Sequence, residues 1–264
     1  MFYASVVLLV GVLLLSFFGN TFYLIDPSHL DKNSILLHPS LEHYFGTDRL
    51  GRDLFARLIE GGQVSLIIGF ASALLSTFVG LLYGVSAALI RGGFDKLFIV
   101  IVDLFLTFPT LFLLLTLVSY VNASVWVLIL IISITGWMGT ARLIRSESFA
   151  IASKPFIRIL HIGKVHPIKI IFKYYAPLLA PIVLVSFTIG VGGAILAESG
   201  LSFLGLGIVA PQMSWGSILS NGKEVIDIAW WVSFFPGLMI FIVTFSLMNI
   251  SNTLQARLNQ KEIR

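Results

Sequence analysis

The amino-acid sequence predicts an all-α integral membrane protein with six transmembrane helices. Of its 264 residues, 57% are hydrophobic and only 11% are charged, and the mean hydropathy is +0.97. A soluble globular domain carries about 25% charged residues. Long apolar runs recur along the chain, each near the ~20 residues that a helix needs to cross a bilayer. The lipid bilayer is therefore the expected surrounding of most of the chain.

The first expected membrane helix covers residues 2–25, which contain no charged side chain. A secretory signal peptide is the alternative interpretation. Signal peptides have a basic region ahead of the apolar run and a small-residue cleavage site, and neither is found here. We therefore expect a retained anchor, which together with the polar residues after it forms a first unit at 1–63.

Residues 26–63 form the longest polar segment, and their slight acidity fits the outer side of the membrane. His38 and His43 lie on either side of Glu42, but this spacing matches no zinc motif, and solvated loop histidines are expected instead. Near the end of the segment, glycines favour tight turns and neighbouring charges favour local ion pairs. An ordinary amphipathic lead-in to the next helix is the alternative. The expected extracytoplasmic motif consists of Gly46, Thr47, Asp48, Gly51, Arg52 and Asp53.

Three more membrane helices are expected at 64–90, 97–121 and 125–139, with a glycine turn after the first of them. The helix at 97–121 contains Asp103 and Pro109. A carboxylate near the bilayer centre costs about 2.5–3.5 kcal/mol, so Asp103 is expected to face other helices or water. Because it lies close to the start of the helix, a solvated interfacial position is the alternative. Pro109 is expected to bend the helix.

A basic loop at 142–177 is the main charged interruption in the second half of the chain. It contains seven Lys and Arg residues and one acidic residue, Glu147, so it is expected to face the cytoplasm. Pro155 suits the first turn of a helix, and His166 with Pro167 is expected to end that helix before a second one begins. The helix presents an apolar side made of Phe156, Ile159, Leu160 and Gly163.

An apolar side on a helix in a cytoplasmic loop needs a partner that covers it. We therefore interpret the helix as a docking element for another protein. A membrane surface with anionic lipids is the alternative, since basic residues next to an apolar face also suit lipid headgroups.

The last two membrane helices are expected at 178–197 and 230–250, and a polar tail follows at 257–264. Glu198 ends the first of these helices and is expected, like Asp103, to be paired or hydrogen-bonded and turned away from lipid. The glycine-rich segment 199–229 is expected to be a folded cap or re-entrant element buried in protein. Trp230 and Trp231 mark a membrane interface.

The distribution of Lys and Arg predicts the orientation. With the 91–96 turn, the 142–173 loop and the tail inside, twelve of the 17 basic residues lie in the cytoplasm. The positive-inside rule then favours six spans with both termini in the cytoplasm.

Several kinds of chemistry are not indicated. The chain has no cysteine, no phosphate-binding loop, no paired-histidine zinc motif and no serine in a nucleophile elbow. No catalytic residue, metal or cofactor is therefore expected. The net charge of +4 does not indicate nucleic acid, because the basic residues stand at the ends of apolar runs.

Motifs spread over nearly the whole chain resemble the permease subunits of bacterial ABC importers for dipeptides, oligopeptides and nickel. They are GTDRLGRD (46–53), VDLFLTFP (102–109), GWMGTARLIRSE, GGAILAESGLSFLGLG, PQMSWGSIL and FFPG. The resemblance implies a type I importer permease fold over 64–256 in the bacterial cytoplasmic (inner) membrane. It also implies a second similar permease, ABC ATPase subunits that hydrolyse ATP, and an extracytoplasmic solute-binding protein as partners.

In that family the central cytoplasmic loop carries a Glu-Ala-Ala type sequence followed by a glycine. Here Arg158, Ile159 and Leu160 stand at the Glu-Ala-Ala positions, and Lys164 stands at the glycine position, one residue after Gly163. The resemblance implies that ATP-driven closure of the ATPase subunits moves this loop and switches the spans between inward-open and outward-open states. The implied ATPase-coupling residues are Phe156, Ile157, Arg158, Ile159, Leu160, His161, Gly163 and Lys164.

Other classes of membrane protein remain open on the residues alone. An ion-coupled secondary transporter needs ion sites near the bilayer midplane, for which Asp103 and Glu198 are candidates. An intramembrane enzyme would need a nucleophile and base or metal ligands within the bilayer, and a scaffold subunit would need no path. The candidate residues of a translocation path are Asp103, Pro109 and Glu198. Peptide and nickel permeases share the motifs, so the solute is not identified.

Overall fold

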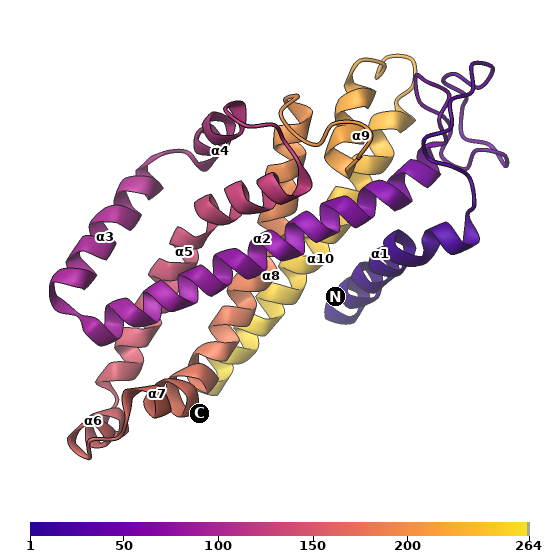
Figure 1. The fold of residues 1–264 in the computed structure, drawn as a ribbon. Helices are drawn as coiled ribbons and strands as arrows, with labels where there is room; N and C mark the ends of the chain where they lie inside the picture. The colour runs from indigo at the N-terminus through magenta and orange to yellow at the C-terminus, as the bar shows by residue number, and fades with distance from the viewer. Residues whose placement is uncertain (263–264) are drawn as a thin grey trace.

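The computed structural model describes residues 1–262, except for the side chains of Arg158, His161, Pro167 and residues 257–262. The described chain is a bundle of long helices, and the longest connection between them is the segment from α1 to α2 (Figure 1). Five of these helices are long and apolar enough to cross a membrane. They are α1 (Phe2–Phe22), α2 (Leu54–Ile90), α5 (Val125–Ser153), α8 (Ala176–Phe203) and α10 (Trp231–Glu262).

A sixth span is broken in two. The helices α3 (Gly92–Thr107) and α4 (Thr110–Ser119) pass the same test together, but they meet at an angle of 86°. Pro109 stands at the break, as predicted. Proline lacks a backbone N–H and forces the residue before it, here Phe108, into an extended conformation with ψ 135°. The prediction of six spans agrees with the structure when this bent pair is taken as one.

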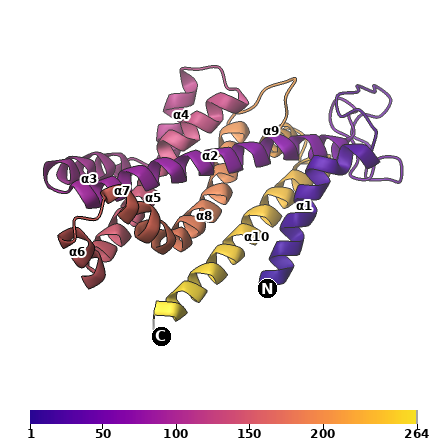
Figure 2. The same cartoon turned by 60° about the horizontal axis from the view of Figure 1, so that its bottom comes forward.

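The bundle has two distinct ends (Figure 1). At one end, here called the loop end, lie α6 (Pro155–Ile162), α7 (Pro167–Ile170), the π-helical turn η1 (Ile171–Tyr175) and the C-terminal end of α10. At the other end, here called the cap end, lie the 26–53 segment, α4 and α9 (Trp215–Lys223). Figure 2 shows α1 beside α10, on the opposite side of the bundle from α3. The polar segments predicted to lie on opposite sides of the membrane thus occupy opposite ends.

Helices α2 and α5 pack closely because α2 carries glycines at their contact. A Cβ atom added at Gly80 would lie 3.0 Å from the backbone nitrogen of Ala141, and one added at Gly84 would lie 2.9 Å from that of Arg145. Small residues let two membrane helices approach until their backbones touch. The two helices therefore cross at 141–145 of α5 with no room for larger side chains on α2.

Several helix boundaries differ from the sequence-based expectation. Helix α8 continues to Phe203 and α10 to Glu262, so the start of the expected glycine-rich segment and most of the expected tail are helical. Two further differences have a cause in the structure. The helix expected at 125–139 continues to Ser153, so the first part of the expected basic loop is helical. Its charges are neutralised by α3: Arg145 binds Asp95 through two hydrogen bonds of 2.6 and 2.8 Å, and Arg142 lies 3.5 Å from Asp103. Likewise α2 begins at Leu54 rather than at residue 64, because the Asp53 side chain caps its first turn.

The orientation of the two ends is tested by cysteine labelling, for which the chain is suited because it contains no cysteine. We expect an impermeant maleimide to label Leu41→Cys at the cap end in intact spheroplasts. The exposed Lys154→Cys at the loop end should be labelled only after the membrane is permeabilised. Labelling of Lys154→Cys in intact spheroplasts would show that the predicted orientation is wrong.

Candidate functional site

A buried ionic cluster stands at the cap end and is centred on Asp48. Its carboxylate accepts a hydrogen bond of 2.8 Å from Nε of Arg52 and lies 3.5 Å from Nε of Arg57. The backbone N–H groups of Leu50 and Arg52 donate to the same carboxylate at 2.8 and 3.1 Å. Local ion pairs were expected in this segment, and the pair of Asp48 with Arg52 is one of them. Arg49 pairs instead with Glu224, directly after α9.

Asp53 joins three parts of the cap end. It accepts hydrogen bonds from the Tyr23 hydroxyl at 2.9 Å and from the Ala56 N–H at 2.8 Å, and its Oδ2 lies 2.8 Å from Nδ1 of His43. Burial raises the pKa of Tyr23 well above its usual value, and the adjacent Asp53 carboxylate raises this pKa further.

Within the described residues, no group of three or more His, Cys, Asp or Glu side chains is placed to hold a metal ion.

Gly46, Thr47 and Gly51 fold the cap-end motif against the rest of the chain. Gly46 has φ +77°, and a Cβ atom there would lie 2.5 Å from the Leu37 carbonyl oxygen. Gly51 has φ +73° and lies against the backbone of Asp31, so both positions need glycine. The Thr47 hydroxyl accepts from the Leu37 N–H at 2.8 Å. Trp231 donates to the Thr47 carbonyl at 3.2 Å, which ties the motif to α10.

Glu198 is fully buried between α8 and α9. Its Oε1 accepts hydrogen bonds from Ser202 at 2.7 Å and from Ser214 at 2.6 Å. Ser214 also caps α9, and the next residue, Trp215, donates its ring N–H to the Leu58 carbonyl at 2.9 Å. The carboxyl group therefore holds the cap-end helix α9 onto the bundle. As predicted, Glu198 faces protein and not lipid. Asp103 is about half exposed and forms an ion pair with Arg142, so it is paired as expected.

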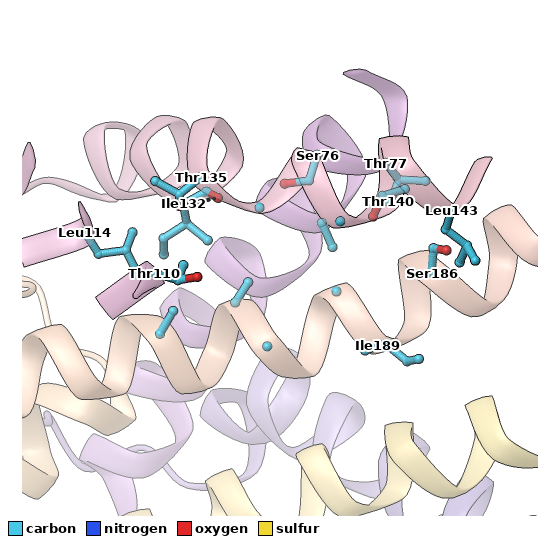
Figure 3. Close-up of a pocket in the computed structure, with 17 residues that line it drawn as sticks. Ser76, Thr77, Thr110, Leu114, Ile132, Thr135, Thr140, Leu143, Ser186 and Ile189 are labelled. Atoms are coloured by element: carbon cyan, nitrogen blue, oxygen red, sulfur yellow. Dashed lines mark hydrogen bonds between the residues drawn. The ribbon is translucent and has the colours of Figure 1, made fainter. Parts of the chain in front are cut away.

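A cavity of about 420 Å³ lies between α2, α4, α5 and α8 (Figure 3). Hydroxyl groups from all four helices line it, and its remaining walls are apolar side chains and glycines. Figure 3 shows Thr140 and Ser186 toward one end of this space and Thr110 with Thr135 toward the other. The lining hydroxyl residues are Ser76, Thr77, Thr110, Thr135, Thr140 and Ser186.

The sequence-based candidates for a translocation path do not line this cavity. Asp103, Pro109 and Glu198 all lie outside its walls, although Thr110, the residue after Pro109, is part of them. The signal that was missed is the helical spacing of small and hydroxyl residues. On α5 it runs over residues 135, 136, 139 and 140, and on α8 over residues 186, 190 and 193. Each such residue alone is ordinary in a membrane helix.

The expected coupling helix is present as α6, which begins at Pro155 as predicted. Ile157 is fully buried in a core cluster with Ile151, Tyr175 and other apolar side chains, and Leu160 packs against that cluster. The exposed apolar side is therefore Phe156, Ile159 and Ile162, and it does not include Leu160 as expected from the spacing.

The remaining coupling residues lie at the end of α6 or outside the described side chains. Gly163 and Lys164 follow the helix, are exposed, and begin the turn toward α7, with φ +51° at Lys164. The side chains of Arg158 and His161, which belong to the same predicted set, lie outside the described residues.

The described chain is an all-helical membrane bundle with a short, partly exposed helix between two spans. The chain belongs to the family of binding-protein-dependent transport system inner membrane components, which matches residues 76–263. It is thus a multi-pass inner membrane protein of the ABC importer permease class, as its sequence motifs implied.

Similar proteins share most of the length of the chain. It is 31% identical over 261 residues to the oligopeptide transport system permease protein OppC of Haemophilus influenzae, covering 98% of this chain and 84% of that protein. It is 32% identical over 234 residues to the nickel transport system permease protein NikC of Escherichia coli K12, covering 89% of this chain and 84% of the other.

The fold is also found among solved structures. An inward-facing form of the MetNI methionine ABC transporter contains a chain that superposes with a TM-score of 0.57 at 17% identity, covering 74% of this chain and 95% of that one. At this low identity, the likeness concerns the fold alone.

Proposed function

We propose that this permease forms half of the translocation path of an ATP-driven peptide importer and receives its power stroke through the 153–175 segment. Nickel is the alternative solute, because relatives of both kinds match the chain at similar identity. The partners would be a second similar permease, separate ABC ATPase subunits and an extracytoplasmic solute-binding protein. The chain itself would catalyse no reaction and hold no cofactor.

The proposal rests on two features of the structure, the hydroxyl-lined cavity and the helix α6. Six hydroxyl groups on four helices offer hydrogen-bonding capacity to the polar backbone of a peptide, while the apolar walls tolerate different side chains. The Ser76 and Thr135 hydroxyls already donate to backbone carbonyls, so these two offer acceptors only. A second similar permease facing this cavity would supply the other half of a path.

The second element of the proposal is mechanical. Because Ile157 anchors α6 in the core of the loop end, a force applied to its exposed side reaches the bundle. Moving the equilibrium between the inward-open and outward-open states from 1:99 to 99:1 takes a difference of about 5.5 kcal/mol in interaction free energy between the two states. A helix that is packed into the bundle shifts the neighbouring helices when it is displaced, whereas a solvated loop would change its own conformation instead.

The path is tested by filling the cavity at Gly139, which lines it and where an added Cβ atom would meet nothing within 4 Å. In proteoliposomes with all partner subunits, we expect Gly139→Leu to lower uptake of a labelled peptide several-fold, because a branched side chain then occupies the path. ATPase co-purification should stay unchanged. The matched control is Gly11→Leu on α1, where an added Cβ atom also meets nothing within 4 Å.

Equal uptake by the Gly139→Leu and wild-type complexes would contradict the assignment of the path. Parallel assays with labelled nickel separate the two solutes. Uptake by the purified permease without ATPase subunits would instead favour an ion-coupled secondary transporter.

A further inference from the structure

The loop end contains a second cavity, of about 520 Å³, which is separate from the hydroxyl-lined cavity. It lies where the ends of α2 and α5 meet α6 and η1. Its polar wall is formed by Arg91, Ser153 and Tyr175, and its apolar wall includes Leu89, Phe149 and Ile162.

Arg91 brings an uncompensated positive charge to this cavity. Its Nε donates to the Ala88 carbonyl at 3.2 Å, and its guanidinium lies 5.5 Å from the centre of the Phe149 ring. Arg145 lies over the same ring at 4.7 Å, but its charge is neutralised by Asp95. No carboxylate of the described residues lies within ion-pair distance of Arg91. Most of its donors therefore remain available to an anion.

Tyr175 supplies the second, independent observation. Its side chain is 1% exposed, and its hydroxyl has no hydrogen-bond partner within the described part of the chain. Buried hydroxyl groups are normally hydrogen-bonded, so the hydroxyl of this wall residue keeps an unused hydrogen-bond donor next to Arg91 and the cavity. Tyr175 also ends the π-helical turn η1, and such turns in helices occur frequently at functional sites.

We propose that this cavity binds the phosphate group of an anionic ligand. Arg91 and Tyr175 donate hydrogen bonds to the phosphate oxygens, and Leu89, Phe149 and Ile162 contact the organic part. A planar guanidinium matches the geometry of phosphate and binds it through paired hydrogen bonds. Two sources share this chemistry, the headgroup of an anionic phospholipid and a soluble phosphate compound. A bound ligand would connect α6 to the ends of α2 and α5.

The test measures ligand binding to the purified full-length chain by native mass spectrometry, so it does not depend on transport. The probes are dioctanoyl phosphatidylglycerol, inorganic phosphate and dioctanoylglycerol, which lacks phosphate. We expect the wild type to bind one phosphate-bearing probe at saturation and not to bind dioctanoylglycerol at the same concentrations. Arg91→Gln should weaken binding about tenfold or more, as expected for the loss of a charged hydrogen bond. Tyr175→Phe, which keeps the packed ring, should weaken it several-fold.

The control variant is Lys96→Gln, which removes an exposed charge at the same end of the bundle from a residue that does not line the cavity. Its binding should equal that of the wild type. Preferential binding of phosphatidylglycerol identifies a lipid headgroup, and equal or tighter binding of inorganic phosphate identifies a soluble compound. The proposal is overturned if no phosphate probe binds, if dioctanoylglycerol binds as well, if Lys96→Gln weakens binding as much as Arg91→Gln, or if both cavity variants bind normally.

Discussion

Ile159→Asp is expected to abolish ATP-driven uptake and to remove the ATPase subunits from the purified complex, while the permease stays folded and inserted. Ile159 is 66% exposed on α6, between the exposed Phe156 and Ile162, so its replacement leaves the packed core of the loop end intact. A carboxylate at the centre of an apolar docking surface would have to be buried without a partner, which costs several kcal/mol. Co-purification in detergent and uptake in proteoliposomes measure the two effects.

The matched control for this prediction is Ile168→Asp. Ile168 is also an exposed isoleucine of the 153–175 segment, but it lies on α7 and not on α6, the helix that is proposed to dock. We expect this variant to keep its ATPase subunits. Normal uptake by Ile159→Asp would show that α6 does not couple this permease to an ATPase. Retained ATPase binding with lost uptake would favour contact of α6 with the membrane surface.

Asp48→Ala is expected to lower the free energy of unfolding by about 3–5 kcal/mol, the usual result of removing one partner of a buried ion pair. Asp48 is 2% exposed and Arg57 is 4% exposed, so the change leaves the Arg57 guanidinium buried without its carboxylate. The backbone N–H groups of Leu50 and Arg52 lose their acceptor as well. Equilibrium unfolding in mixed micelles measures the difference.

The exposed ion pair between Arg49 and Glu224 provides the control at the same end of the molecule. Because both side chains are substantially exposed, Glu224→Gln should change the unfolding free energy by about 1 kcal/mol or less. Equal stability of Asp48→Ala and wild type would mean that the buried cluster does not hold the cap end together.

The membrane helices and the break at Pro109 were predictable because they rest on local properties: apolar length, and the missing N–H of proline. The true end of α5 was not predictable in this way. Arg142 and Arg145 appear as loop charges in the sequence, yet each lies beside a carboxylate of α3, some 40–50 residues earlier in the chain. A helix boundary set by such distant partners does not follow from local composition.

The candidate site was predictable only in part, for a similar reason. Spacing predicted the position of α6, but the side that it buries depends on the neighbouring cluster around Ile151 and Tyr175, which turns Leu160 inward and leaves Ile162 exposed. The cavity between α2, α4, α5 and α8 was not predictable because no single residue in its wall is unusual. Charged residues are the more prominent signal in the sequence, but Glu198 holds α9 in place and does not line the cavity.

Helix α5 is unbroken, so it can act as a rigid lever between the two ends of the bundle. It runs without a break from the wall of the hydroxyl-lined cavity to Ser153, and only Lys154 separates it from α6. From Thr140 to Ser153 the lever arm is about 20 Å long at 1.5 Å per residue. The close crossing with α2 at Gly80 and Gly84 lies near Thr140 and can serve as its fulcrum. In the mechanism that we propose, a sideways push on α6 would be carried along α5 into the cavity wall, because the helix from Thr140 to Ser153 has no break.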